Sequence, residues 1–269
     1  MRALTSEETE EALRAHGLDR PTGVGFAFRD ATPDHFYDWH AHVYHQLLYA
    51  SQGAVQIETA HGRYMLPQAR AAWIPAGTRH RTLLSGARGA SIFFAPAAVE
   101  DISQRARILV ADPLMREMIL FATRWERGVS ETDPLASSFL TTLALLCGRW
   151  LEAELPLFLP RTDHPAIARA MDYALTDPGA ASLAGAVAAA ALSERTFRRT
   201  FAREAGLGWQ VWLTQARILN AMSLLIEGQR VTAVSAEVGY NSMSAFAKAF
   251  ATLTGEAPAQ FRERHSASA

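Results

Sequence analysis

The chain has 269 residues, of which 49% are hydrophobic and 20% are charged, a balance typical of a globular protein and not of a disordered one. Its formal net charge is -1, and residues 164–269 contain 10 Arg and Lys against 8 Asp and Glu, an excess too small for a broadly basic domain, so any contact with nucleic acid must come from locally clustered arginines. Its single cysteine, Cys147, excludes an internal disulfide framework and a cysteine-based metal cage.

The N-terminal segment, MRALTSEETEEALRAHG, is acidic and amphipathic and lacks the apolar core of a signal peptide. No segment of the sequence approaches the roughly 20 consecutive apolar residues that a membrane span needs. We therefore expect the protein to act in the cytoplasm.

Residues 24–95 read as a series of short strands separated by Gly, Pro and polar breaks. The predicted strands are VGFAF, HQLLYA, AVQIET, RAAWIP and ASIFFA. Short strands at regular intervals are typical of a barrel or sandwich, so we expect a barrel domain over residues 1–110.

Histidines gather at one place in this predicted barrel. The side chains that alternate along one predicted strand, and so should face the same way, are His40, His42, Tyr44 and Gln46. His80 follows a turn and enters the next strand. Three imidazoles and an amide oxygen inside a small barrel can form a four-ligand metal site. His45 has the opposite parity and should face away, unless a bulge turns it inward.

This spacing resembles the two motifs of the cupin barrel. The first cupin motif, His-x-His, three residues, Glu, six residues, Gly, corresponds to His40, His42, Gln46 and Gly53. The second, Pro-x-Gly-x-x-His, corresponds to Pro75, Gly77 and His80. The resemblance implies a divalent metal held by His40, His42, Gln46 and His80, with zinc, nickel, iron and copper all suited to imidazole ligands.

Glutamine in place of the motif's glutamate removes a negative charge, so the metal should bind more weakly and redox catalysis is disfavoured. The alternatives are that the histidines fill a polar barrel mouth or contact an organic effector without metal. The aromatic residues predicted to line an effector pocket beside the site are Trp39, Tyr44, Tyr49 and Trp73. Their alternative role is in the hydrophobic core.

After Pro96 the apolar pattern becomes helical. Asp112–Arg127 and Asp133–Leu155 each begin with Asp-Pro, a capping residue followed by proline at the first helical position. We expect an antiparallel helix pair over residues 111–155, with Leu114, Met118, Phe121 and Trp125 forming the apolar stripe of the first helix. The pair serves either dimerisation or packing on the outer face of the barrel. A proline-rich linker over residues 156–163 follows.

The region 164–269 is predicted to be entirely helical and to contain two helix-turn-helix units. Ser193 caps a helix over Glu194–Ala205, and Ser242 caps another over Met243–Leu253. Each helix carries two phenylalanines four residues apart that would anchor it in a core. Between the units, Trp209–Ile226 forms a helix of about 27 Å. Two recognition helices separated by such a rod can read major-groove segments about 34 Å apart.

The segment from Ser182 to Arg262 resembles the AraC-type DNA-binding domain. The matching pieces are LSERTFRRTFAREAG, ARILNAMSLL, VTAVSAEVGYNSMSAFAKAF and TGEAPAQFR, of which the last two are highly specific. The resemblance and the arginine cluster predict the following DNA-contacting residues: Arg195, Thr196, Arg198, Arg199, Ser242, Met243, Ser244, Ala247 and Lys248. Met243 and Ala247 cannot hydrogen-bond to bases, so the second unit should read thymine methyls, phosphates or DNA shape.

The predicted fold class is α+β, a cupin-like barrel followed by an all-helical domain. The predicted function is an AraC-type transcription regulator that binds double-stranded DNA as a homodimer and responds to a metal or small molecule. The histidine segment also resembles a subgroup of these regulators associated with exporter genes. The alternatives are a metal-dependent cupin enzyme, a dioxygenase or isomerase, and a constitutive DNA-binding protein whose barrel has lost its ligand.

Overall fold

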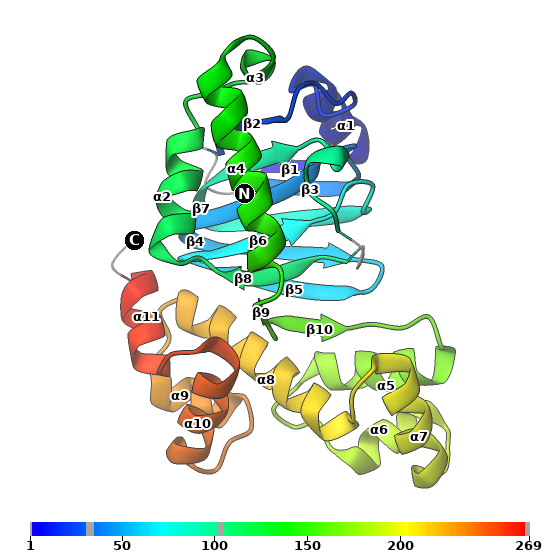
Figure 1. The fold of residues 1–269 in the computed structure, drawn as a ribbon. Coiled ribbons are helices and arrows are strands. Elements are labelled where there is room, and N and C mark those ends of the chain that lie inside the picture. Colours follow the sequence, from blue (N-terminus) through cyan, green and yellow to red (C-terminus); the bar gives the residue numbers. More distant parts are fainter. Residues whose placement is uncertain (1, 31–34, 102–104, 267–269) are drawn as a thin grey trace. The chain divides into compact units, whose positions relative to one another are not determined.

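The computed structural model describes residues 2–30, 35–101 and 105–266, and the chain divides into two compact units. The first unit comprises the chain up to residue 155 except residues 60–63, and the second comprises residues 60–63 and the chain from residue 156 onward. Strands dominate the first unit and helices the second (Figure 1), which confirms the predicted fold class. Among the described residues, no helix combines the length and the apolar character needed to cross a bilayer.

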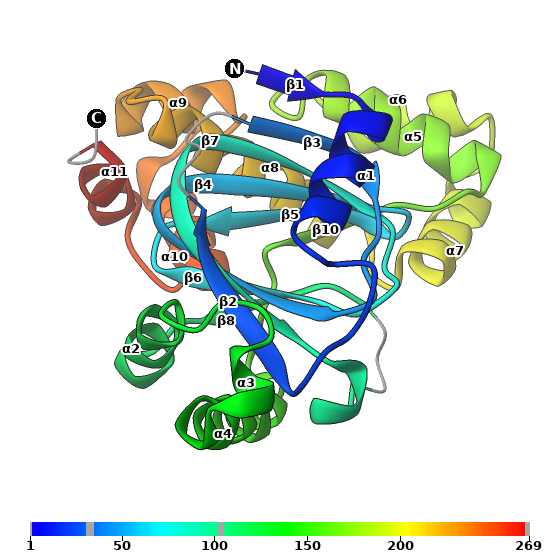
Figure 2. The same cartoon turned by 90° about the horizontal axis from the view of Figure 1, so that it is seen from above.

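The strands of the first unit curve around a common interior (Figure 2). They are β1 (Arg2–Leu4), β2 (Gly25–Asp30), β3 (His35–His40), β4 (His45–Thr59), β5 (Gly62–Pro67), β6 (Arg70–Ile74), β7 (His80–Phe94), β8 (Arg107–Val110) and β9 (Glu154–Leu155). The long antiparallel pair of β4 and β7 lies at the centre of the sheet, with β3 and β1 beyond β7 and β6, β8 and β9 beyond β4. A short helix, α1 (Ser6–Ala15), lies between β1 and β2, and the 3-10 turn η1 (Pro96–Ala98) lies between β7 and β8.

Two details of the predicted strands are wrong. The segments HQLLYA and AVQIET are not separate strands, because β4 continues through Gly53 and absorbs the extra residues in two register shifts against β7. Conversely, His40 and Gln46 are not on one strand, since β3 ends at His40 and β4 begins only at His45.

The two Asp-Pro helix starts are confirmed. Asp112 and Asp133 accept hydrogen bonds from backbone amides in the first turns of α2 (Pro113–Ala122) and α4 (Pro134–Trp150). Both helices end earlier than predicted. After α2, the Trp125 carbonyl accepts a hydrogen bond from the Ala27 amide of β2. After α4, residues 154–155 pair with β8 as a strand. A short helix, α3 (Val129–Thr132), connects the two.

Helices α2 and α4 pack on the outer face of the sheet. Their buried residues form one apolar cluster with Leu47 of β4 and Trp73 of β6. The buried stripe of α2 is Met115, Ile119 and Ala122, so the predicted stripe is wrong at Leu114 and Phe121, which are 56% and 39% exposed. Cys147 lies in the same cluster, and burial strongly raises the pKa of its thiol.

The second unit contains seven helices among its described residues. They are α5 (Pro165–Thr176), α6 (Leu183–Ala190), α7 (Glu194–Ala205), α8 (Trp209–Ile226), α9 (Val231–Glu237), α10 (Met243–Thr254) and α11 (Pro258–Ser266). The predicted linker contains a strand, β10 (Phe158–Pro160), which pairs with β5. Its neighbour Arg161 donates from its backbone amide to the carbonyl of His61, and Trp212 donates from Nε1 to the carbonyl of Pro160.

Candidate functional site

The fold brings three histidines of the barrel together. His40 ends β3 and His80 begins β7, and the two residues are partners in the sheet register. Their ring centroids lie 4.2 Å apart, and the ring of His42 lies 5.2 Å from that of His80. The three side chains are at most 8% exposed. The predicted grouping of these histidines therefore exists, although a loop and not a strand carries His42.

Backbone carbonyls fix the tautomer of all three imidazoles. Nδ1 of His40 lies 2.7 Å from the carbonyl of Asp38, Nδ1 of His42 lies 2.7 Å from that of Tyr44, and Nδ1 of His80 lies 2.8 Å from that of Thr78. A carbonyl oxygen only accepts, so each Nδ1 must carry the proton, which leaves a lone pair on each Nε2. Metal-binding histidines are commonly held in this way.

Gln46 contacts this cluster, as the motif predicts. Its Oε1 lies 3.2 Å from Nε2 of His42, while its Nε2 donates to Oγ of Ser91 over 2.9 Å. With the proton of His42 on Nδ1, two acceptors face each other. Such a contact is favourable only if a cation lies between them, or if the amide is turned over so that its nitrogen donates to His42.

Burial keeps the cluster neutral. Burial, followed by the neighbouring His40, lowers the pKa of His42 to about 4, and burial holds the pKa of His80 well below its ordinary range. Neutral imidazole is the form that binds metal. Within the described part of the chain, however, no three His, Cys, Asp or Glu side chains are already arranged to hold a metal ion. The cluster supplies suitable donors but is not a preformed coordination sphere.

His45 lies on the other face of the sheet, as its parity predicts. Its ring stacks on that of Trp73 at 5.0 Å, and its Nδ1 accepts a hydrogen bond from the amide of Ala76. It belongs to the packing between the sheet and the helices.

Three of the four aromatic residues predicted for an effector pocket are core residues. Tyr49 and Trp73 lie in the cluster beneath α2 and α4, on the face of the sheet opposite to Gln46. Trp73 also donates from Nε1 to Asp101. Tyr44 is fully buried, and its hydroxyl donates to the Arg20 carbonyl and accepts from the Thr22 amide. The fourth, Trp39, lines a cavity.

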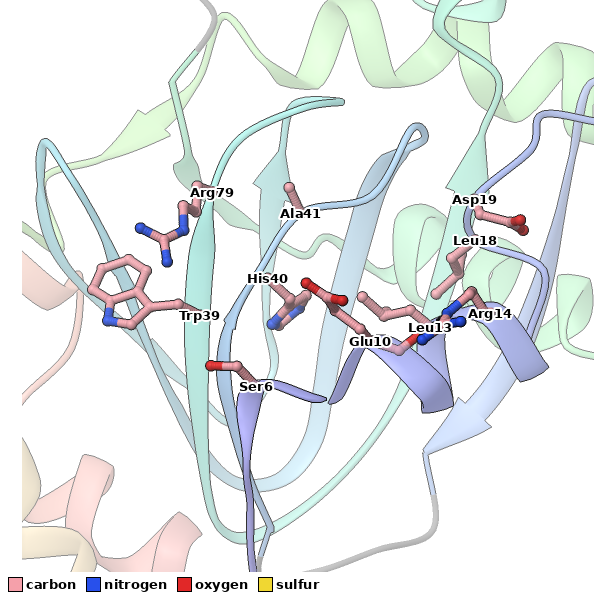
Figure 3. Close-up of a pocket in the computed structure, with 10 residues that line it drawn as sticks. All are labelled: Ser6, Glu10, Leu13, Arg14, Leu18, Asp19, Trp39, His40, Ala41 and Arg79. Atoms are coloured by element: carbon pink, nitrogen blue, oxygen red, sulfur yellow. Dashed lines mark hydrogen bonds between the residues drawn. The ribbon is translucent and has the colours of Figure 1, made fainter. Parts of the chain in front are cut away.

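That cavity, of about 440 Å³, opens beside His40 at α1 (Figure 3). Trp39, His40 and Arg79 line it from the barrel, and Arg79 lies 5.4 Å from the centre of the Trp39 ring. Its remaining lining residues are Ser6, Glu10, Leu13, Arg14, Leu18, Asp19 and Ala41. The sequence interpretation missed these N-terminal residues, although their amphipathic pattern indicated a helix with one face against a core.

Helix α7 in the second unit presents arginines to solvent. Its N-terminus is capped by Ser193, whose Oγ accepts from the amide of Thr196 and donates to its Oγ1. Phe197 and Phe201 are fully buried, while the side chains of Arg195, Arg198 and Arg199 are exposed on the opposite side. Arg198 donates from Nε to Glu194 over 2.8 Å, an ion pair between two exposed side chains. Within the described residues, Arg195 and Arg199 have no ion-pair partner.

Helix α10 has the same arrangement as α7, a serine cap, two buried phenylalanines and an exposed opposite side, but it carries fewer charged residues. Oγ of Ser242 accepts from the amide of Ala245 and contacts the hydroxyl of Ser244, and Phe246 and Phe250 are fully buried. Met243 is 42% exposed, Ser244 and Lys248 are exposed, and Ala247 is half-buried. The two helices lie at opposite ends of α8, both toward the lower edge of Figure 1.

Two family models match the chain. Residues 23–156 match the AraC-like ligand binding domain, and residues 186–264 match a helix-turn-helix domain. The chain belongs to the AraC family of transcription regulators. A curated relative, the HTH-type transcriptional regulator NimR of Escherichia coli (strain K12), is 27% identical over 249 residues, which cover 90% of this chain and 88% of NimR. These matches identify a transcription regulator with a ligand-binding domain and set aside the cupin enzyme.

Solved structures of other regulators are similar in part. A structure of ToxT from Vibrio cholerae O395 bound to a naphthalenyl-butenoic acid is 11% identical, covers 90% of this AraC-family chain and 98% of its own, and has a TM-score of 0.39. The DNA-binding domain of AdpA in complex with a target DNA is 30% identical, covers 38% of this chain and 94% of its own, and has a TM-score of 0.36.

Replacing Lys248 with alanine is expected to weaken DNA binding by a similar factor on all sequences. Lys248 is the exposed cation of α10, and a lysine acts on phosphate as a point charge. Losing one phosphate contact should reduce the slope of log affinity against log salt by about one. Titrations of specific and random duplexes at several salt concentrations measure both effects, with Arg149→Ala in the first unit as the control. A preferential loss on the specific duplex would contradict the phosphate role.

Proposed function

We propose that the barrel of this AraC-family regulator senses its effector at the cluster of His40, His42 and His80, and that occupancy alters how α7 and α10 engage DNA in the cytoplasm. The observation that carries this proposal is the shared tautomer, which gives three buried, neutral imidazoles a lone pair on Nε2. Such a lone pair can ligate a metal ion or accept a hydrogen bond from an effector.

Two kinds of effector suit this place. A divalent transition metal fits the donors, because imidazole nitrogen and an amide oxygen can all ligate zinc, nickel, iron or copper. Gln46 would complete such a site through the oxygen that already faces His42. A small organic molecule instead fits the adjacent cavity, where Arg79 and Trp39 offer a guanidinium and a planar ring. Metal is the effector that we favour, since it explains the two facing acceptors.

Elemental analysis of untagged protein, paired with DNA-binding titrations with and without chelator, tests the metal proposal. Wild type is expected to hold one metal ion per chain, and His42→Ala to lose it. His45→Ala is the matched control, because His45 is a buried histidine of the same barrel that stacks on Trp73. Metal in wild type and its loss in His42→Ala, with altered affinity for DNA, support sensing by metal. If the purified protein contains no metal and its affinity for DNA is the same with and without chelator, the metal proposal is contradicted.

We further propose that the protein is a homodimer joined through α2 and α4. These helices expose Leu114, Phe121, Leu135 and Leu145, of which Leu145 is 70% exposed. Large apolar side chains exposed on neighbouring helices can contribute to an interaction surface. A second copy of the chain is the occupant that suits it, because two copies can bury the same leucines against each other.

Leu145→Asp is expected to convert the dimer into a monomer without unfolding it, because the aspartate would place charge in an apolar interface while lying in solvent in the monomer. Light scattering at micromolar concentration, with and without DNA, measures the change. Val43→Asp is the control, since Val43 is another exposed apolar residue but lies in the loop before β4. A monomeric wild type would refute the dimer.

The regulated gene is proposed to encode an exporter. This proposal rests on the resemblance of the segment from His40 to Ala50 and of residues 73–80 to exporter-associated regulators. Transcript profiling of a deletion strain tests it, and unchanged levels of every exporter transcript would contradict it.

A further inference from the structure

The two helix-turn-helix units touch through a loop and a turn, in addition to their connection by α8. The loop, residues 177–182, links α5 to α6, and the turn, residues 238–242, links α9 to α10 and follows Glu237, the last residue of α9. The contact is too close for side chains. A Cβ atom on Gly179 would lie 2.1 Å from the Glu237 carbonyl oxygen, and one on Gly239 would lie 2.4 Å from the Gly179 carbonyl oxygen. Two glycines are therefore needed for the backbones to meet.

Arg217, in the middle of α8, holds this contact. Its Nε donates to the carbonyl of Pro178 over 2.8 Å, and its Nη2 donates to the carbonyls of Gly179 and Ala181 over 3.0 and 3.3 Å. The same Nη2 lies 3.1 Å from the position of a Cβ on Gly239. The guanidinium thus binds the loop of the first helix-turn-helix unit beside the turn of the second helix-turn-helix unit. It also lies near the C-terminal end of α5, where unpaired carbonyls favour a positive charge.

We propose that Arg217 is a positioning residue that fixes the two helix-turn-helix units relative to each other, so that α7 and α10 act as one reader with a set spacing. This inference rests on α7 and α10 being the DNA-reading helices. With a flexible link, each helix-turn-helix unit could still bind its half of a DNA site. Once the first unit had bound, however, the affinity of the second unit for its half would increase less. The rigid contact orders the two helix-turn-helix units in the free protein, so DNA binding does not have to pay the entropic cost of ordering them.

The test uses duplexes selected from a random pool by the full-length wild type. Each selected site is prepared intact, with one half scrambled, and with the spacer lengthened by two base pairs. Arg217→Gln is expected to lose about tenfold in affinity for the intact site, to bind half-scrambled duplexes within about twofold of wild type, and to tolerate the longer spacer. Gly179→Ala should behave in the same way, because it forces the loop from the turn while leaving Arg217 in place.

Two controls separate positioning from folding. Arg169→Gln removes a guanidinium that donates to the carbonyls of Ala189 and Ala190, a contact that does not involve the second helix-turn-helix unit. Gly208→Ala adds a methyl group where nothing lies within 4 Å. Neither should change the spacer dependence. Equal losses on intact and half-scrambled sites, or a wild-type spacer dependence in both Arg217→Gln and Gly179→Ala, would overturn the proposal.

Discussion

Replacing Arg199 with alanine is expected to abolish sequence-specific DNA binding while leaving the fold intact. Arg199 is exposed on α7, on the side opposite to the buried Phe197 and Phe201, and needs no other contact to be broken before it binds. A guanidinium that binds a guanine edge through two hydrogen bonds contributes about 1–3 kcal/mol of discrimination, or roughly five- to 150-fold in affinity. Binding to random DNA should fall far less, because the other cations remain.

Footprinting with a selected operator measures this loss. Arg199→Lys should retain much of the binding to random DNA but not the discrimination, because an ammonium lacks the planar fork of a guanidinium. The matched control is Arg203→Ala, since Arg203 lies in the last turn of the same helix and binds Glu204 over 2.7 Å. Operator affinity equal to that of wild type in Arg199→Ala would remove α7 from the interface.

Acid is expected to destabilise the metal-free barrel through the histidine cluster. The pKa of His42 is about 4 in the folded protein, against an ordinary value of 6.5. Between these values the unfolded chain binds a proton that the folded chain does not, so stability is present above pH 6.5 and is lost as the pH falls toward 4. Burial of His42 should account for about 2 kcal/mol of the free energy of unfolding lost between pH 7 and pH 5.

Urea unfolding in the presence of chelator, at both pH values, measures this loss. Carboxylates also contribute to the stability lost between pH 7 and pH 5. The decisive comparison is therefore between the loss in wild type and the loss in His42→Gln, which should be smaller. His16→Gln serves as control, because His16 is exposed outside the cluster. An unchanged pH dependence in His42→Gln would show that His42 does not resist protonation in the folded barrel.

The helical part of the fold could be predicted closely because its signals are local. Ser193 and Ser242 cap their helices as expected, and Gly206 and Gly255 end them in the left-handed conformation. The bounds of Trp209–Ile226 agree with the structure. Capping residues, glycine stops and phenylalanines at helical spacing act within a few residues of one another, so a single sequence contains them.

The barrel was less predictable because its structure depends on pairing between distant residues. The parity of His45 was correct, and the same rule places Tyr49 with Leu47 on the helix-covered face, away from Gln46. Applying the rule to Tyr49 would have removed it from the predicted pocket. The contribution of α1 to the cavity and the contacts of Arg217 join residues far apart in the chain. The amphipathic pattern of residues 6–15 indicates a helix, but no local pattern shows which distant residues α1 or Arg217 contacts.

The most direct test of the regulator mechanism is a base-by-base interference footprint of one selected operator with full-length protein. If α7 and α10 read DNA together from the two ends of α8, each bound subunit should give two protected major-groove patches, with centres about one helical turn, or ~34 Å, apart. Lys248→Ala should weaken the patch that α10 contacts, and Arg199→Ala should leave no positioned footprint. A single patch per subunit, or two patches whose separation varies freely among selected sites, would contradict it.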